Sequence, residues 1–351
     1  MRHLHCRLVN PPTQDPAVFV HFLFQNRGLL FDIGSIEMLS TRDILKISDV
    51  FVSHTHMDHF YGFDRLLRVC LGRNKTIRFF GPEGFLHHIE GKLQAYSWDL
   101  VGNYPLPFIL VATEVGPGTL RTRTYRCADA FQPHQETHAP WNGSLLWSEP
   151  RFDITCAMLD HGIPCLGFAL QERFHIHILP EALERLRLKP GPWLVDFKNA
   201  LYRDPASRET IAIPDPENLS KSLTFRMDEL SRCIAKISEG MRIGYVTDAV
   251  YHPENAEKIR RIIERADLLF IEAAFLEADA GLAFRKHHLT ARQAGELAGH
   301  AGVREFRLFH FSPRYAGRSK EIENEAQEAY RKALRKDIIP PPNGKEDSHA
   351  S

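Results

Sequence analysis

Three histidines and an aspartate crowd into one short segment, which reads Ser-His-Thr-His-Met-Asp-His-Phe over residues 53–60. Side chains two positions apart on an extended segment point the same way, so His54 and His56 can hold one ion together. Asp58 and His59 are adjacent and diverge, so they can turn towards a second ion beside the first. Imidazole nitrogens and carboxylate oxygens suit zinc, and also manganese or iron. The segment therefore predicts a metal site, with a histidine-rich surface loop as the alternative.

Further ligand-type side chains follow three apolar stretches later in the chain. They are Asp160-His161, Asp248 and His310. Loops at the carboxyl ends of strands are where the sites of α/β sheets gather. Each residue alone could equally be a turn former or a helix cap. Together with the first segment they supply about the number of ligands that a two-metal site needs.

The elements that must position these residues alternate between strands and helices. The first cluster follows an apolar strand end at 49–52 and precedes apolar residues at helical spacing over 61–71. Strands and helices continue to alternate up to a charged helix over about 320–334. We therefore expect an α/β fold in which two sheets pack on one another with helices outside, a four-layer arrangement.

The stretch over residues 171–220 differs from its surroundings. It contains several prolines, charges of both signs and weak periodicity. We expect it to be an arm or flap inserted into a single domain that spans residues 1–337. The proline-rich, polar tail over 338–351 is expected to be disordered.

Bulk composition excludes some classes of protein. The chain of 351 residues has 44 Lys and Arg against 44 Asp and Glu, so it lacks a strongly basic nucleic-acid footprint. We expect no membrane span, because no apolar run is long enough, and we see no signal-peptide pattern. The six cysteines are scattered without a Cys-x-x-Cys pair, which favours a reducing, cytoplasmic location.

The motifs that carry a family resemblance are spread between residues 30 and 315. They are Asp32-Ile33-Gly34, His54 to His59, Gly81-Pro82, Leu159-Asp160-His161, Thr247-Asp248, Glu272-Ala273, His288-Leu289-Thr290-Ala291 and His310 to Tyr315. In these motifs the chain resembles the metallo-β-lactamase superfamily, and within it the ribonuclease Z family of tRNA 3′-processing endonucleases. The resemblance implies a four-layer αββα sandwich of the metallo-β-lactamase type with an inserted arm. Met57 stands where the family usually has glycine, and Ile271 where a histidine commonly precedes Glu272, so the chain is a divergent member.

The resemblance also implies ligands for two Zn²⁺ ions and the residues that act on the substrate. His54, His56 and His161 would hold one ion, Asp58, His59 and His310 the other, and Asp248 would bridge them. Asp58 is placed to orient the attacking water or accept its proton. His288, oriented by Glu272, is the candidate donor of a proton to the leaving 3′-oxygen.

The implied substrate is precursor tRNA, from which the enzyme would remove the 3′ trailer. The candidate substrate-binding residues are Lys189 and Lys198 in the arm and Arg314 in the closing motif, His310 to Tyr315. Two alternatives stay open: the same site acting on a small phosphodiester or cyclic nucleotide, and a non-catalytic RNA-binding scaffold. Mn²⁺ or Fe²⁺ could take the place of zinc, and a homodimer is an expectation from the resemblance.

Overall fold

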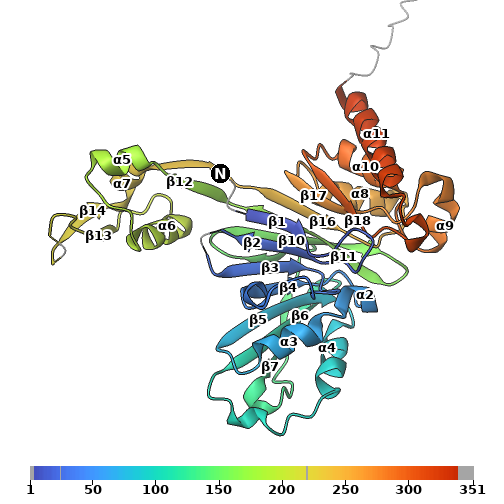
Figure 1. Cartoon of the computed structure of the whole chain (residues 1–351), viewed down its shortest axis with the longest axis horizontal. Coiled ribbons are helices and arrows are strands. Elements are labelled where there is room, and N and C mark those ends of the chain that lie inside the picture. The colour runs from blue at the N-terminus through green and yellow to red at the C-terminus, as the bar shows by residue number, and fades with distance from the viewer. Residues whose placement is uncertain (1–3, 24, 219, 339–351) are drawn as a thin grey trace, which may run out of the picture. The chain divides into compact units, whose positions relative to one another are not determined.

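Figure 1 shows the computed structural model of the chain, which describes residues 4–23, 25–218 and 220–338. The backbone divides into two compact units. Unit 1 is Met1–Ser144, Cys156–Ala169 and Ile243–Ser351, and unit 2 is Leu145–Thr155 and Leu170–Arg242. The insertion expected over 171–220 falls inside unit 2. The tail expected to be disordered, 338–351, lies outside the described residues apart from its first one.

The first sheet of unit 1 is built from strands that follow one another in the sequence. The strands, in sheet order, are β1 (Leu4–Leu8), β2 (Val18–Phe22), β3 (Arg27–Phe31), β4 (Ile47–Phe51), β5 (Lys75–Pro82), β6 (Phe108–Gly116), β7 (Thr119–Arg126) and β8 (Thr137–Pro140). Strands β3 to β6 run parallel, and the outer strands pair antiparallel. The parallel strands therefore end at the same edge of the sheet.

Helices cover one face of the first sheet. They are α1 (Thr41–Ile44), α3 (Phe63–Cys70) and α4 (Phe85–Gln94), with α2 (Met57–Phe60) and the 3₁₀ turns η1 (Val101–Asn103) and η2 (Cys127–Asp129) nearby in the chain. Helix α3 buries Phe63, Leu66, Leu67 and Cys70, the i, i+3, i+4, i+7 pattern of an amphipathic helix. These side chains share one apolar core with residues of the sheet such as Phe79.

The second sheet has the strand order β18-β17-β16-β11-β10-β9. Its strands are β18 (Phe306–Phe309), β17 (Leu268–Glu272), β16 (Arg242–Val246), β11 (Pro164–Glu172), β10 (Phe152–Asp160) and β9 (Leu145–Ser148). Strands β16, β17 and β18 are parallel. The boundaries between the two units fall within β10, β11 and β16, and β9 pairs with the part of β10 that belongs to unit 2.

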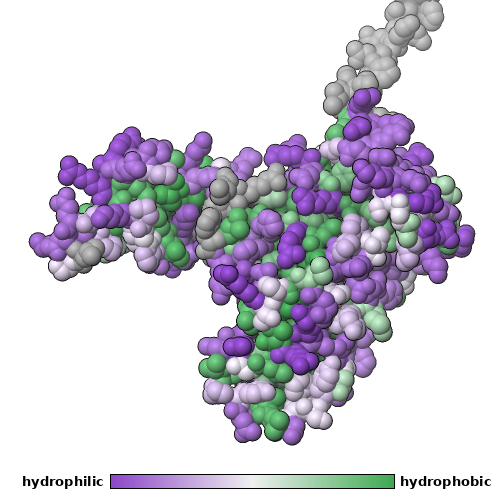
Figure 2. Space-filling view, viewed as in Figure 1, coloured by the Kyte–Doolittle hydropathy of each residue, from purple (hydrophilic) through white to green (hydrophobic). Residues whose placement is uncertain are grey.

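A second helical layer packs on this sheet through a separate apolar core. Its elements are α8 (Pro253–Ile262), η3 (Glu277–Asp279), α9 (Ala280–Arg285), α10 (Ala291–His300), η4 (Pro313–Tyr315) and α11 (Ser319–Ile338). Helices α10 and α11 touch closely, since a Cβ at Gly295 would lie 2.1 Å from the carbonyl oxygen of Ala326. The face of these two helices seen in Figure 2 is largely hydrophilic, as expected of an outer layer.

Aromatic side chains fill the space between the two sheets. The ring centroid of Phe31 in the first sheet lies 5.8 Å from that of Phe168 and 5.6 Å from that of Tyr245, both in the second sheet. Phe51 also contacts Phe168, at 5.8 Å. The order of layers is therefore helix, sheet, sheet, helix, and the αββα arrangement predicted from the sequence is confirmed.

Unit 2 has an apolar core of its own. Its elements are β9, β12 (Phe174–Ile178), α5 (Pro180–Arg185), α6 (Trp193–Arg203), β13 (Thr210–Pro214), β14 (Ser222–Arg226), α7 (Met227–Ile234) and β15 (Ala235–Glu239). Strands β12 and β15 form one antiparallel pair, and β13 and β14 form another. Trp193 is buried in this core with Phe197 and Ile234, and its indole nitrogen donates to the carbonyl of Lys189 at 2.9 Å. No helix among the described residues is long and apolar enough to cross a membrane.

Candidate active site

The ligand-type residues predicted from the sequence lie on loops that follow strand ends. The His-x-His segment follows β4, and helix α2 begins directly after His56. Asp248 follows β16, Glu272 ends β17, and His310 follows β18. Because β16, β17 and β18 are parallel, their carboxyl ends meet at one edge of the sheet. His161 reaches the same place from the turn between β10 and β11.

The structure brings all seven predicted ligands together in overlapping groups. The groups are His54, His56, His161 and Asp248; Asp58, His59 and His310; and Asp248, Glu272, His288 and His310. Within each group, one possible ligand atom from every residue lies within 4.8 Å of the others. The clustering therefore joins residues that are more than 250 positions apart in the chain.

Asp248 lies between the two predicted ligand sets. Its Oδ2 is 3.6 Å from His54 Nε2, 3.4 Å from His161 Nε2 and 3.4 Å from His59 Nε2. Its Oδ1 is 3.1 Å from His310 Nδ1. Ligands at about 2.0–2.1 Å from a tetrahedral ion are separated by roughly 3.3 Å. The donor set and its spacings therefore fit divalent cations.

A buried carboxylate, Asp32, fixes the first ligand loop from behind. Its oxygens accept hydrogen bonds from Ser53 N (2.6 Å), Ser53 Oγ (2.7 Å), His59 Nδ1 (2.8 Å) and the Tyr245 hydroxyl (2.7 Å). Since Ser53 Oγ donates to Asp32, it is left to accept from His54 Nδ1 at 3.0 Å. The imidazoles of His54 and His59 are thereby each held at Nδ1, with Nε2 towards the site, as in metal-binding histidines.

The remaining imidazoles also present nitrogens to the centre of the cluster. His161 Nδ1 donates to the carbonyl of His287 at 2.8 Å, which leaves its Nε2 for the site. His59 Nε2 and His310 Nδ1 are buried and make no hydrogen bond of good geometry among the described residues, although each lies within 3.4 Å of an Asp248 oxygen. Buried polar atoms are rarely left this way unless a ligand satisfies them. This observation supports a cation beside Asp248, where these nitrogens point.

Glu272 connects the cluster to His288. One oxygen, Oε1, accepts from Ala249 N at 2.8 Å and from Leu289 N at 3.2 Å. The other, Oε2, lies 2.9 Å from His288 Nδ1. Glu272 is fully buried and His288 is partly exposed. The carboxylate therefore holds His288 with its Nε2 free.

No family model matches the chain. A protein from Deinococcus radiodurans named ribonuclease Z is 29% identical over 319 residues, covering 89% of this chain and 91% of its own length. A protein of the same name from Crocosphaera subtropica is 27% identical over 312 residues, covering 86% and 82%. The crystal structure of the metallo-beta-lactamase fold protein YhfI from Bacillus subtilis matches with a TM-score of 0.50 at 15% identity, covering 90% and 86%.

The chain has the metallo-β-lactamase fold and resembles ribonuclease Z. Both statements confirm the resemblance predicted from the sequence. Of the two departures noted there, Met57 is 79% exposed at the start of α2, so the loop accepts a side chain at this position. Ile271 is buried in the core beneath the second helical layer.

Two residues that sequence reasoning missed hold the site of this metallo-β-lactamase fold in place. Asn255, fully buried, donates to the carbonyls of Asp160 at 3.0 Å and Val250 at 2.7 Å, and accepts from Asp160 N at 3.1 Å. It thereby ties the turn that carries His161 to the segment after Asp248. The only sequence signal was an asparagine in the first turn of a helix.

The second missed residue is His88, which sequence reasoning left without a role. Its Nδ1 lies 2.7 Å from Thr55 Oγ1. Thr55 stands between His54 and His56, so this contact fixes the His-x-His segment from the side of α4. A histidine on a separate helix gives no local sequence signal of such a role.

The charges of the cluster balance one another through protonation. Burial lowers the pKa of His54 to about 2, so this imidazole is neutral and available as a ligand. At His310 burial opposes protonation, but the Asp248 carboxylate outweighs it and raises the pKa to about 10. Burial also works against ionisation of Asp248, yet the cationic His310 and His59 hold its pKa well below the usual range. A bound cation would replace these protons as the counter-charge.

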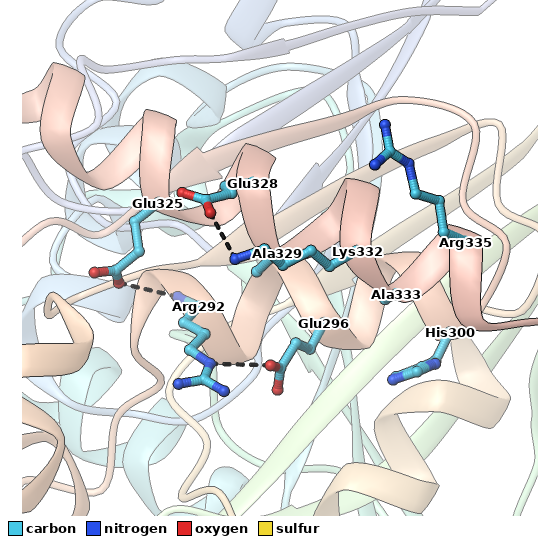
Figure 3. Close-up of a pocket in the computed structure, with 9 residues that line it drawn as sticks. All are labelled: Arg292, Glu296, His300, Glu325, Glu328, Ala329, Lys332, Ala333 and Arg335. Atoms are coloured by element: carbon cyan, nitrogen blue, oxygen red, sulfur yellow. Dashed lines mark hydrogen bonds and ion pairs between the residues drawn. The ribbon is translucent and has the colours of Figure 1, made fainter.

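The cluster opens into a cleft of about 380 Å³ in unit 1. Its walls are residues 13–15, 274–275 and 310–313, together with Asp58, Lys286 and His288. A second hollow lies between α10 and α11, where Arg292 pairs with Glu296 and Lys332 with Glu328 (Figure 3). Its charges compensate each other along the helices, so the cleft beside His288 is the candidate active site.

Proposed function

We propose that the chain is a dinuclear metal-dependent endoribonuclease that removes the 3′ trailer from precursor tRNA. The observation that carries the proposal is the Asp248 carboxylate, which lies between two sets of ligand-type side chains. The similarity to proteins named ribonuclease Z over most of their length supports the substrate.

The proposed metals are two Zn²⁺ ions, for which Mn²⁺ or Fe²⁺ could substitute at the same donors. His54, His56 and His161 would hold one ion, Asp58, His59 and His310 would hold the other, and Asp248 would serve both. When bound, such a pair of cations supplies Lewis acidity to the phosphoryl group and activates water for attack.

The residues of the chain itself move the protons. Asp58 is partly exposed to the cleft and accepts the proton of the attacking water. Burial works against a charge on His288, but the Glu272 carboxylate outweighs it and raises the pKa of His288. His288 is therefore more readily protonated than a free imidazole, and in this proposal it donates to the leaving 3′-oxygen through Nε2. Glu272 keeps the imidazole in the required orientation.

Substrate contacts outside the cleft complete the proposal. Lys189 is exposed on unit 2, and Lys198 is half-buried on α6. Arg314 is half-exposed and pairs with Asp279 at 3.3 Å, so an RNA phosphate would compete with that carboxylate. We further propose a cytoplasmic location. We also propose a homodimer, and sedimentation of the purified protein would test that oligomeric state.

The deciding experiment is cleavage of a 3′-extended tRNA transcript by purified protein, with and without a chelator. We expect one cut after the acceptor stem, loss of that cut on chelation and its return with Zn²⁺. Elemental analysis should give two metal ions per chain. Cleavage that survives chelation would contradict the metal mechanism. Hydrolysis of a chromogenic phosphodiester without any cut in tRNA would favour the small-substrate alternative.

A further inference from the structure

Lys286 is a cation in the candidate cleft that the mechanism above does not use. It lines the same cavity as Asp58, His288 and His310. Among the described residues that line this cavity, it is the one lysine or arginine. No carboxylate of the described part of the chain lies within ion-pair distance of its ammonium group. Arg314, by contrast, is paired with Asp279.

An unpaired lysine on an open surface would need no explanation, because solvent satisfies its charge. Lys286 differs because it stands two residues before His288, the candidate general acid, and lines the same cleft as His288. The cleft faces a substrate that carries a negative charge at every linkage. A lysine ammonium binds phosphate as a point charge, with several donors that need no fixed geometry.

The backbone around Lys286 is held by the site itself. Helix α9 ends at Arg285, and His288 N donates to the carbonyl of Ala283 at 2.9 Å, which closes the turn. Between them, His287 has a φ of 59°, and its carbonyl accepts from His161 Nδ1 at 2.8 Å. The turn that presents Lys286 and His288 is therefore anchored to a proposed metal ligand.

We propose that Lys286 binds the phosphate one nucleotide upstream of the scissile linkage. This inference rests on the proposed function. His288 donates its proton to the leaving 3′-oxygen, so the nucleotide that bears this oxygen lies on the wall that Lys286 shares. The nearest further phosphate on that side is the one on the 5′ face of the same nucleotide. Such a contact sets the register of the backbone in the cleft without reading a base.

The test compares Lys286→Ala, Lys286→Arg and a matched control, Arg285→Ala, with the wild-type holoenzyme. Arg285 carries the same charge one position away, is not among the residues that line the cleft, and lies along α9, with Nη1 3.6 Å from where Gly281 would carry a Cβ. The substrates are synthetic 3′-extended acceptor-stem RNAs with either a natural phosphate or a neutral methylphosphonate at the upstream linkage. The readouts are KM, kcat and the salt dependence of kcat/KM.

We expect Lys286→Ala to raise KM about tenfold and to reduce the slope of log kcat/KM against log salt by about one. Lys286→Arg should recover most of the loss, because it restores the charge. The methylphosphonate substrate should raise the KM of the wild type by a similar factor and leave the KM of Lys286→Ala unchanged. Arg285→Ala should stay within about twofold of the wild type on both RNAs.

Two results would overturn the inference about Lys286 alone. In one, Lys286→Ala and Arg285→Ala behave alike on the natural RNA. In the other, the methylphosphonate affects Lys286→Ala as strongly as the wild type. A wild-type protein that does not cut the natural RNA at all would instead contradict the proposed function, and the inference would fall with it.

Discussion

The candidate site and unit 2 differ in how deeply their charged side chains are buried and in how many hydrogen bonds those side chains accept. In the site, Asp32 and Glu272 are fully buried, and each accepts several donors from loops far apart in the chain. In unit 2 the core around Trp193 and Phe197 is apolar, and surface ion pairs such as Arg187 with Glu217, 3.8 Å apart, leave 86% and 81% of their side chains exposed. Glu172, near the start of the segment Leu170–Arg242 of this unit, is an exception and is buried. A buried, fully bonded carboxylate fixes its neighbours, whereas an exposed ion pair fixes little. Substitutions in the site should therefore change metal binding and chemistry, and those in unit 2 should change substrate binding.

The largest effect should come from the two residues proposed to move protons. Asp58→Ala or His288→Ala should lower the single-turnover rate on 3′-extended tRNA by about 10²–10⁴-fold, the usual contribution of general acid and base catalysis. Both side chains reach the cleft, so thermal unfolding should stay cooperative. Glu254→Ala, an exposed acid on α8, is the control and should keep the wild-type rate. Insoluble or non-cooperative protein in both variants would show that these side chains serve the fold.

The first ligand cluster could be predicted because its chemistry is local. His54 to His59 place four ligand-type side chains within six positions, and strand-to-helix spacing shows which way they point. Asp248 and His310 could be predicted as candidates because each follows an apolar stretch. Their φ values of 39° and 62° could not be foreseen, because tertiary contacts impose them.

The groups that hold the ligands in place could not be predicted from sequence. Asn255 bonds to Asp160 across 95 positions, and His88 reaches Thr55 from another helix. Hydrogen bonds of this kind leave no periodic pattern in a sequence. The core of unit 2 was hidden for a different reason: its strands have five residues or fewer and α5 has six, too short for a clear hydrophobic period.

A smaller effect should follow from removing Asp32, the carboxylate behind the proposed metal ligands. Asp32→Ala should weaken Zn²⁺ binding about 10–100-fold, because His59 loses the partner that orients it. It should also lower the melting temperature, since buried donors of Ser53 and Tyr245 lose their acceptor. Isothermal titration and thermal unfolding measure the two effects.

Asp228→Ala is the matched control in unit 2, where the carboxylate pairs with Arg226 near the surface. Its Zn²⁺ affinity should equal that of the wild type. Equal affinities in Asp32→Ala and Asp228→Ala would contradict the difference drawn between the two regions.

Metal affinity should also rise with pH. The pKa of His310 is raised to about 10 in the metal-free site, so at neutral pH a cation must displace its proton. The pKa of His54 is lowered to about 2, so this ligand releases none. Binding that releases a proton becomes stronger as pH rises, by about tenfold per unit for each proton, up to the pKa near 10. Titrations in two buffers of different ionisation enthalpy count the protons, and a heat independent of buffer would contradict the prediction.

The smallest effect should come from the charges of unit 2. Lys189→Ala combined with Lys198→Ala should raise KM for 3′-extended tRNA by a few fold, since each phosphate contact of an exposed lysine contributes little by itself. Lys198 should contribute less than Lys189, because burial lowers the pKa of its ammonium and its side chain is half-buried on α6, whereas Lys189 is exposed. Lys221→Ala, an exposed lysine between β13 and β14, is the control and should leave KM unchanged. Zn²⁺ affinity should match the wild type in the double variant and in the control, because no contact of the proposed metal cluster comes from unit 2 within the described residues. A loss of metal affinity in the double variant would mean that the two regions are coupled, and the division of labour between them would have to be abandoned.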